Sequence, residues 1–410
     1  MSAAPRRPVR VGVFGLLGSG NLGNDGSLEA VLRYLRTDHP DAVVDALCGG
    51  PEAVTARFGI PATRLHWNRA EYRTASRLGS VAAKGAGKLV DVFRTAAWVR
   101  RHDVVIVPGM GVLEATLPLR PWGFPYSLFL LCASGRLQRT PVALVGVGAA
   151  EIRSRPTRAL VRWSARCAAY RSYRDGPSRD AMRAMGVDTG RDEVYPDLAF
   201  SLPAPRPDAP TGTPGTVCLG VMDFHGGNDD RARADEIHRR YLDGTIRFVR
   251  TLTGEGRPVR LLTGDRCDTA VVDAILAAVD SPLVTAAEPA SLADLMAEMA
   301  AADAVVAVRY HNLICALKTG VPVLALCYAT KSEALMERMG LGAHCHPARE
   351  VDADRLLEQF RALEKDAAEL RRTLVATNRT ATEQLADQFR ALTTTLFPAH
   401  PRAKALRETA

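Results

Sequence analysis

The sequence has little of what marks nucleic-acid-binding and membrane-spanning proteins. Aromatic residues make up 6% of the chain and are not interleaved with basic residues, and no known nucleic-acid-binding motif is present. No apolar stretch reaches about 18 residues without a charge, so we expect no transmembrane span. Residues 1–8 lead directly into a predicted strand, and we therefore expect no signal peptide.

Cysteine pairs with metal-ligand or redox spacing are also missing. The 8 cysteines are scattered and form no Cys-x-x-Cys pair, and several lie in apolar runs, where cysteine behaves as a small hydrophobic residue. We expect these thiols to be reduced and buried, which favours a cytoplasmic location.

The chain does have enough apolar material for two cores. Of its 410 residues, 47% are hydrophobic, and this length predicts two domains of ordinary size. Lys and Arg number 53 and Asp and Glu 45, which gives a net charge of 53 − 45 = +8. A mild excess of this kind favours anionic ligands or membrane surfaces over nucleic acid.

Strand and helix patterns alternate through both halves of the chain. This alternation predicts two Rossmann-like, doubly wound α/β domains, each with a parallel sheet covered on both faces. The Pro-rich stretch 203–214 is the best candidate linker. We expect an N-terminal domain over 1–203, a second domain over 204–350 and C-terminal helices over 351–410.

The most informative segment is Ala304–Leu326. It reads as a buried strand (304–308), a polar loop, a helix starting near Asn312 and ending at Gly320, and a second strand (321–326). Arg309 and His311 come where the first strand ends. A cation, an imidazole and the amides of a helix N-terminus would then meet at the carboxyl edge of a parallel sheet, which predicts an anion site.

A second candidate is the glycine-rich loop Gly15–Gly26, which we expect between a strand (9–14) and a helix (27–35). Its glycines would let the backbone approach a ligand, and Gly20, Asn21 and Gly23 are the candidate contacts. The Gly18–Gly23 part matches Gly-x-Gly-x-x-Gly, but no acid follows the second strand, which argues against a dinucleotide. A tight turn without a ligand is the alternative.

Four elements in order resemble the polysaccharide pyruvyl transferase family. They are the Gly-Ser-Gly-Asn-Leu-Gly-Asn-Asp loop (18–25), Arg174-Asp175-Gly-Pro-Ser178 with Gly186, Pro196-Asp197-Leu-Ala-Phe200, and Arg309-Tyr-His311 with Gly320-Val-Pro322 and Tyr328…Lys331. Together they cover roughly residues 10–340. The sequence departs from the family pattern at Asn24-Asp25, at Pro108–Gly111 and after Gly148, all in the half where we expect the acceptor.

The resemblance implies a fold similar to the two-domain glycosyltransferase B architecture, with the active site in a cleft. It also implies transfer of a pyruvyl group from phosphoenolpyruvate to two hydroxyls of a sugar. The product would be a cyclic ketal on a cell-envelope polysaccharide or its lipid-linked precursor, and no cofactor would be needed.

The residues fit that chemistry. A donor with a phosphate and a carboxylate needs several cations, and Arg309, Arg174 and Lys331 are the candidates, with Asn312 at the helix start. His311 is the natural general acid, because histidine titrates near neutral pH. The proton acceptor is left open among four carboxylates, which are Asp25, Asp175, Asp197 and Asp223.

Structural roles remain open for these residues. Arg309 could pair with a helix carboxylate, His311 could cap a helix, Arg174 could pair with Asp175, and Asp197 could stabilise a turn. Lys331 could be a plain surface lysine.

Further candidates follow the first strand of the second half. Asp223 and His225 could bind the acceptor. We expect no metal there, because no third ligand stands at a familiar spacing, and none at His344 and His346, which we place in a surface loop.

The segment 69–101 holds eight basic residues against two acids, with an apolar stripe of Val81, Leu89, Val92, Phe93 and Trp98. It is either a solvated helix face or a patch for anionic lipid or a lipid-linked acceptor.

Two other functions compete. A nucleotide-sugar glycosyltransferase of the same architecture would usually carry a glutamate late in the donor helix, where this chain has none. A catalytically inactive sugar- or anion-binding homologue is favoured by the departures in the first half.

Overall fold

The computed structural model describes residues 7–67, 77–114, 121–205 and 213–397. Contacts within the chain divide it into two units. Unit 1 comprises residues 1–19, 27–198 and 386–410, and unit 2 comprises residues 20–26 and 199–385. Much of the predicted linker, residues 206–212, lies outside the described part.

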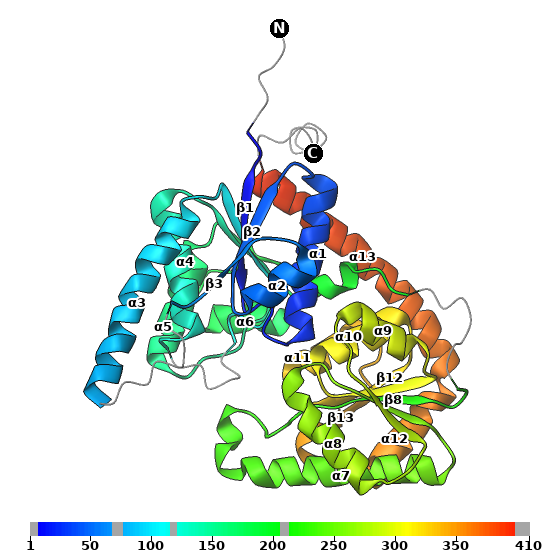
Figure 1. Ribbon diagram of the computed structural model, residues 1–410. Coiled ribbons are helices and arrows are strands. Elements are labelled where there is room, and N and C mark those ends of the chain that lie inside the picture. The colour runs from blue at the N-terminus through cyan, green and yellow to red at the C-terminus, as the bar shows by residue number, and fades with distance from the viewer. Residues whose placement is uncertain (1–6, 68–76, 115–120, 206–212, 398–410) are drawn as a thin grey trace. The chain divides into compact units, whose positions relative to one another are not determined.

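Unit 1 contains a parallel seven-stranded sheet in the order β3-β2-β1-β4-β5-β6-β7. Helices α1 and α2 lie on one face and α3, α4 and α5 on the other (Figure 1). The direction of winding reverses between β1 and β4, so the loops after these strands share one edge of the sheet. The elements are β1 (Arg10–Gly15), α1 (Leu22–Asp38), β2 (Val43–Cys48), α2 (Pro51–Phe58), β3 (Ala62–Arg64), α3 (Arg77–Val99), β4 (Val104–Pro108), α4 (Phe124–Gln138), β5 (Val142–Val147), α5 (Arg155–Cys167), β6 (Tyr170–Tyr173), α6 (Gly176–Ala184) and β7 (Glu193–Val194).

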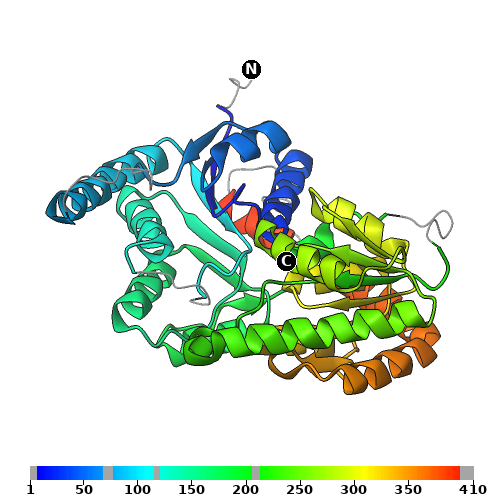
Figure 2. The same ribbon diagram turned by 60° about the horizontal axis from the view of Figure 1, so that its bottom comes forward.

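Unit 2 contains a parallel six-stranded sheet in the order β10-β9-β8-β11-β12-β13, with its reversal between β8 and β11. Helices α7 and α12 pack side by side on one face, where the long α7 is drawn in green in Figure 2. The elements are β8 (Val217–Gly220), α7 (Ala234–Gly254), β9 (Val259–Leu262), α8 (Thr269–Ala278), β10 (Val284–Ala287), α9 (Leu292–Ala300), β11 (Ala304–Ala307), α10 (Tyr310–Thr319), β12 (Val323–Cys327), α11 (Thr330–Arg338), β13 (Cys345–Pro347) and α12 (Ala353–Lys365).

The last helix, α13 (Ala367–Leu396), contributes to both units. Within unit 1, the Phe389 ring stacks on Tyr34 of α1 at 4.8 Å, and the Tyr34 hydroxyl lies 2.8 Å from Thr393 Oγ1. Gln388 Nε2 donates to Ser172 Oγ of β6 at 2.8 Å. The apolar stripe of this helix therefore completes the core of unit 1.

The two parallel sheets confirm the predicted fold class. Helix α10 ends at Gly320 as expected, because this residue takes the left-handed conformation (φ 75°) that favours glycine. Other expectations were wrong. Helix α1 begins at Leu22, five residues before the predicted start at residue 27. His346 was expected in a surface loop but is buried in β13. Cys267 was expected to be buried like the other cysteines but is exposed.

Among the helices that the structure describes, none combines the length and the hydrophobicity needed to cross a bilayer.

Candidate functional site

The carboxyl edge of the unit 2 sheet gathers most of the predicted site residues. Strand β8 is followed by Asp223 and His225, β11 by Arg309 and His311, and β12 by Lys331 at the start of α11. Strands β8 and β11 are the neighbours between which the winding reverses. Ligands of doubly wound sheets bind at this point, because the two flanking loops diverge and leave a crevice.

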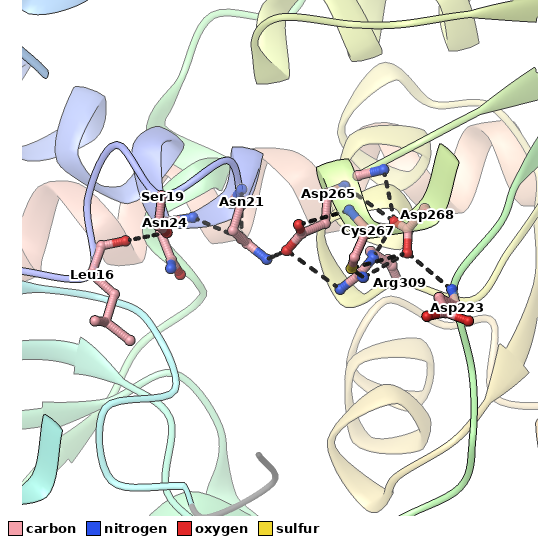
Figure 3. A network of polar contacts seen from close by, with 11 residues as sticks. Leu16, Ser19, Asn21, Asn24, Asp223, Asp265, Cys267, Asp268 and Arg309 are labelled. Carbon is pink, nitrogen blue, oxygen red and sulfur yellow. Dashed lines mark hydrogen bonds and ion pairs between the residues drawn. The ribbon is translucent and has the colours of Figure 1, made fainter. Parts of the chain in front are cut away.

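Arg309 is held at this edge by a buried carboxylate. Its Nε and Nη2 both donate to Asp268, the latter at 2.6 Å, and its Nη1 lies 3.9 Å from Asp265 Oδ2. The Asp268 carboxylate is fully buried and also accepts from the backbone N–H of Asp223 at 2.9 Å. Figure 3 shows this network running from Asn21 through Asp265 and Arg309 to Asp268 and Asp223.

The ion pair fixes the charge of Arg309. Burial would lower the pKa of the guanidinium, but the hydrogen bonds and charge of Asp268, with the charge of Asp265, raise it above its ordinary value. Burial raises the pKa of the neighbouring Cys267 thiol to about 11, although Arg309 acts to lower it. Arg309 is thus a permanent cation, and Nη1 is the nitrogen that Asp268 leaves for a ligand.

Half of the glycine-rich loop belongs to unit 2. Asn21 Nδ2 donates to Asp265 at 2.9 Å, and its Oδ1 accepts from the N–H of Gly23 and Asn24 at 3.1 and 3.2 Å. This side-chain cap explains why α1 starts at Leu22. The loop was expected on the acceptor side, yet residues 20–26 contact the network around Arg309.

His311 lies against this loop. A β-carbon at Gly23 would overlap the His311 ring, so only glycine allows this approach. The Tyr310 ring meets His311 edge to face at 5.6 Å, which fixes the imidazole at the N-terminal end of α10.

Asn312 follows in the first turn of α10 and is fully buried. A β-carbon at Gly264 would overlap its Oδ1. Within the described residues, neither its Nδ2 nor its Oδ1 has a hydrogen-bond partner. Because buried amides are costly without partners, these atoms mark a place where the site can accept a further polar group.

Two more cations stand near this edge. Lys331 Nζ lies over the rings of Tyr310 and Tyr328, at 5.9 and 5.3 Å from their centroids. Arg266 is exposed beside Gly20, and its side chain has no ion pair among the described residues. Arg266 was not among the residues predicted from the sequence.

Arg174 has a different environment, in the interior of unit 1. It is 4% exposed, and its guanidinium lies 2.6 Å from Glu114, 3.5 Å from Asp197 and 3.7 Å from Asp175. A β-carbon at Gly148 would overlap the Glu114–Arg174 pair. This burial disfavours Arg174 as a direct clamp for a substrate and favours a positioning role.

The candidate proton acceptors differ in exposure. Asp25, Asp175 and Asp197 are 7%, 6% and 2% exposed, and Asp175 caps α6 by accepting from Ser178 N–H at 2.7 Å. The side chain of Asp223 is 34% exposed at the edge of the unit 2 sheet. Of the four, Asp223 has the most exposed side chain.

Asp223 also contacts two histidines. Its Oδ1 lies 3.0 Å from His225 Nε2 and 3.6 Å from His238 Nδ1, and the imidazole rings stack at 4.3 Å. His238 comes from α7 and was missed in the sequence, because it is 13 positions beyond His225. Asp265 and Asp268 could have been found, since both acids closely follow the buried strand β9.

Solved structures with the same architecture support the fold. One is a putative UDP-N-acetylglucosamine 2-epimerase from Listeria monocytogenes (13% identity, 97% of this chain and 99% of that chain covered, TM-score 0.61). A second is the UDP-GlcNAc 2-epimerase from Neisseria meningitidis bound to UDP-GlcNAc (11% identity, 95% of this chain and 99% of that chain covered, TM-score 0.59). A third is Anabaena HepE in complex with UDP (13% identity, 94% of this chain and 100% of that chain covered, TM-score 0.56). At these identities the likeness concerns the fold alone, which is GT-B-like. No curated protein matches the chain.

The family comparison goes further than the fold. The model of the family described as polysaccharide pyruvyl transferase matches residues 21–329. This range begins at the Asn21 cap and extends past Arg309, His311 and Tyr328, so it includes the network described above. The chain therefore belongs to the polysaccharide pyruvyl transferase family and is a transferase.

Proposed function

We propose that the protein moves a pyruvyl group from phosphoenolpyruvate to two hydroxyls of one sugar, forming a cyclic ketal. The acceptor is a cell-envelope polysaccharide or its lipid-linked precursor. The observation that carries this proposal is the family match over residues that include a fixed guanidinium, Arg309, and an imidazole, His311, at one edge of the unit 2 sheet.

The donor would bind at that edge through its two anionic groups, a phosphate and a carboxylate. Nη1 of Arg309 and the N-terminus of α10 contact one anionic group, and the exposed Arg266 and Lys331 bind the other. Asn312 supplies a further polar contact. Asp268 and Asn21 hold Arg309 and the loop in place, so they act as positioning residues.

The chemistry proceeds by one addition followed by one displacement. His311 donates a proton to the methylene carbon of the donor, and the neighbouring carbon becomes electrophilic. One sugar hydroxyl bonds to that carbon and loses its proton to a carboxylate, for which Asp223 is favoured by its exposure. The second hydroxyl then bonds to the same carbon and loses its proton to the departing phosphate, which leaves with the electrons of the broken carbon–oxygen bond.

Phosphate release tests this function. Released phosphate should depend on both phosphoenolpyruvate and an acceptor sugar, and Arg266→Ala should raise the KM for phosphoenolpyruvate about tenfold or more, since a charge-assisted contact contributes about 1.5–3 kcal/mol. The matched control is Arg239→Ala, which removes an exposed arginine from α7. Equal KM values in the two variants would reject Arg266 as a donor contact.

A thermal-shift screen separates the competing functions. Phosphoenolpyruvate should raise the melting temperature, whereas UDP should not. Stabilisation by UDP alone would instead favour a nucleotide-sugar glycosyltransferase. Saturable binding of phosphoenolpyruvate without phosphate release, across a panel of acceptor sugars, would identify an inactive homologue.

The membrane contact stays a proposal and rests on unit 1. Leu89 and Phe93, one turn apart on α3, are 65% and 74% exposed, and Trp122 before α4 is 65% exposed. Trp98, expected in the same stripe, is buried instead and donates to Asp45 at 2.7 Å. The side chains of residues 69–84 lie outside the described part, so four of the eight basic residues of the segment are not placed.

Vesicle flotation tests this contact. The protein should float with phosphatidylglycerol vesicles at low salt and not with phosphatidylcholine vesicles, because basic residues bind anionic headgroups while Leu89 and Phe93 enter the interface. The double substitution Leu89→Ser and Phe93→Ser should reduce flotation severalfold. Leu137→Ser, at an 84% exposed site on α4, serves as the control. An equal reduction of flotation in the double variant and in Leu137→Ser would contradict a membrane contact through Leu89 and Phe93.

A further inference from the structure

The loop after β8 and helix α7 bring three metal-binding side chains together in unit 2. One donor atom from each of Asp223, His225 and His238 lies within 4.8 Å of the other two. The closest approaches are those of Asp223 Oδ1, at 3.0 Å from His225 Nε2 and 3.6 Å from His238 Nδ1. The proposed catalysis uses neither histidine, and both approach Oδ1 of Asp223, which leaves Oδ2 to accept a proton.

We propose that Asp223, His225 and His238 form a binding site for a divalent first-row transition-metal ion. Two imidazoles and one carboxylate suit zinc, iron, cobalt or nickel, whereas magnesium and calcium prefer ligands made of oxygen alone. Three protein ligands also leave at least one coordination position open for water or substrate, as in catalytic metal sites.

The surroundings hold these ligands in place. His238 Nδ1 lies 3.2 Å from the Phe224 carbonyl oxygen and 3.6 Å from Asp223 Oδ1, so the ring is held beside the carboxylate. The backbone N–H of Asp223 is fixed by the buried Asp268. Ligands that are already ordered lose less entropy when the ion binds.

The exposure of the cluster fits a site that solvent can fill. The side chains of His225, Asp223 and His238 are 46%, 34% and 24% exposed. An ion could therefore enter without opening the fold. Because Asp268 contacts both Asp223 and Arg309, the added positive charge would lie close to the proposed donor site and would strengthen its attraction for anions.

Metal titration of the full chain tests the site without substrate, so its outcome is independent of the proposed function. Chelator-treated protein is titrated with Zn²⁺ by calorimetry and with Co²⁺ by visible absorption. We expect one ion per chain, and His225→Gln and His238→Gln should each weaken binding about tenfold or more. Circular dichroism verifies that both variants keep the fold.

The control is His66→Gln. His66 pairs with Asp91 at 3.3 Å in unit 1, a histidine–carboxylate contact that lacks the second histidine of the cluster. This variant should bind the ion like the unaltered protein. The proposal is overturned if the unaltered chain binds neither ion, or if His225→Gln and His238→Gln bind as tightly as His66→Gln.

Discussion

Replacing His311 with glutamine is expected to lower kcat for acceptor-dependent phosphate release about 10²–10⁴-fold, the usual contribution of a general acid. Glutamine keeps a polar side chain of similar size beside Gly23 but has no titratable proton. The KM for phosphoenolpyruvate should change little, since Arg309, Arg266 and the α10 N-terminus remain. Steady-state kinetics at saturating acceptor measure both constants.

Two comparisons make the His311 result interpretable. His66→Gln, at a histidine of unit 1 outside the proposed site, should leave both kcat and KM unchanged. An equal melting temperature in the two variants would exclude unfolding as the cause. A kcat within about threefold of the unaltered value in His311→Gln would remove this residue from the proton transfer.

Replacing Asp268 with asparagine is expected to destabilise unit 2 by about 3–5 kcal/mol, the usual cost of removing one partner from a buried ion pair. The fully buried carboxylate accepts from Arg309 and from the backbone N–H of Asp223, Gly264 and Asp265. Asparagine would direct an N–H₂ group toward some of these donors, and Arg309 would stay charged without its counterion.

Tryptophan fluorescence can show which unit loses stability in Asp268→Asn. All four, Trp67, Trp98, Trp122 and Trp163, lie in unit 1, so their fluorescence reports that unit, whereas far-UV circular dichroism reports both. In urea, Asp268→Asn should lower the unfolding midpoint of the dichroism transition that belongs to unit 2. The midpoint of the fluorescence transition, which belongs to unit 1, should stay almost unchanged. A shift of the fluorescence transition alone would contradict this prediction.

A matched control is available in the same unit. Glu298 accepts from Arg260 Nε and Nη2 at 2.9 and 3.1 Å, but the two side chains are 33% and 31% exposed. Glu298→Gln should cost less than about 1 kcal/mol, because solvent screens this pair. If Asp268→Asn costs no more than Glu298→Gln, the buried pair does not have the structural role assigned to it.

The sequence by itself determined the local architecture of the site. In Ala304–Leu326, uninterrupted apolar residues predicted two buried strands, and Gly320 predicted the helix end, because these signals depend on neighbouring residues alone. The end of the apolar run likewise predicted that Arg309 and His311 follow the carboxyl end of a strand. The family elements, in their order along the chain, then indicated the reaction class.

Only the tertiary structure decided what each side chain does there. Asp268 precedes Arg309 by 41 positions, Glu114 precedes Arg174 by 60, and Asn21 reaches Asp265 across 244. No periodicity encodes such pairings, since they follow from strand order and from which loops share a sheet edge. That is why Arg174 proved to be a buried ion-pair centre and Arg309 a cation held by Asp268. For the same reason the third possible metal ligand, His238, emerged only when α7 packed against the loop after β8.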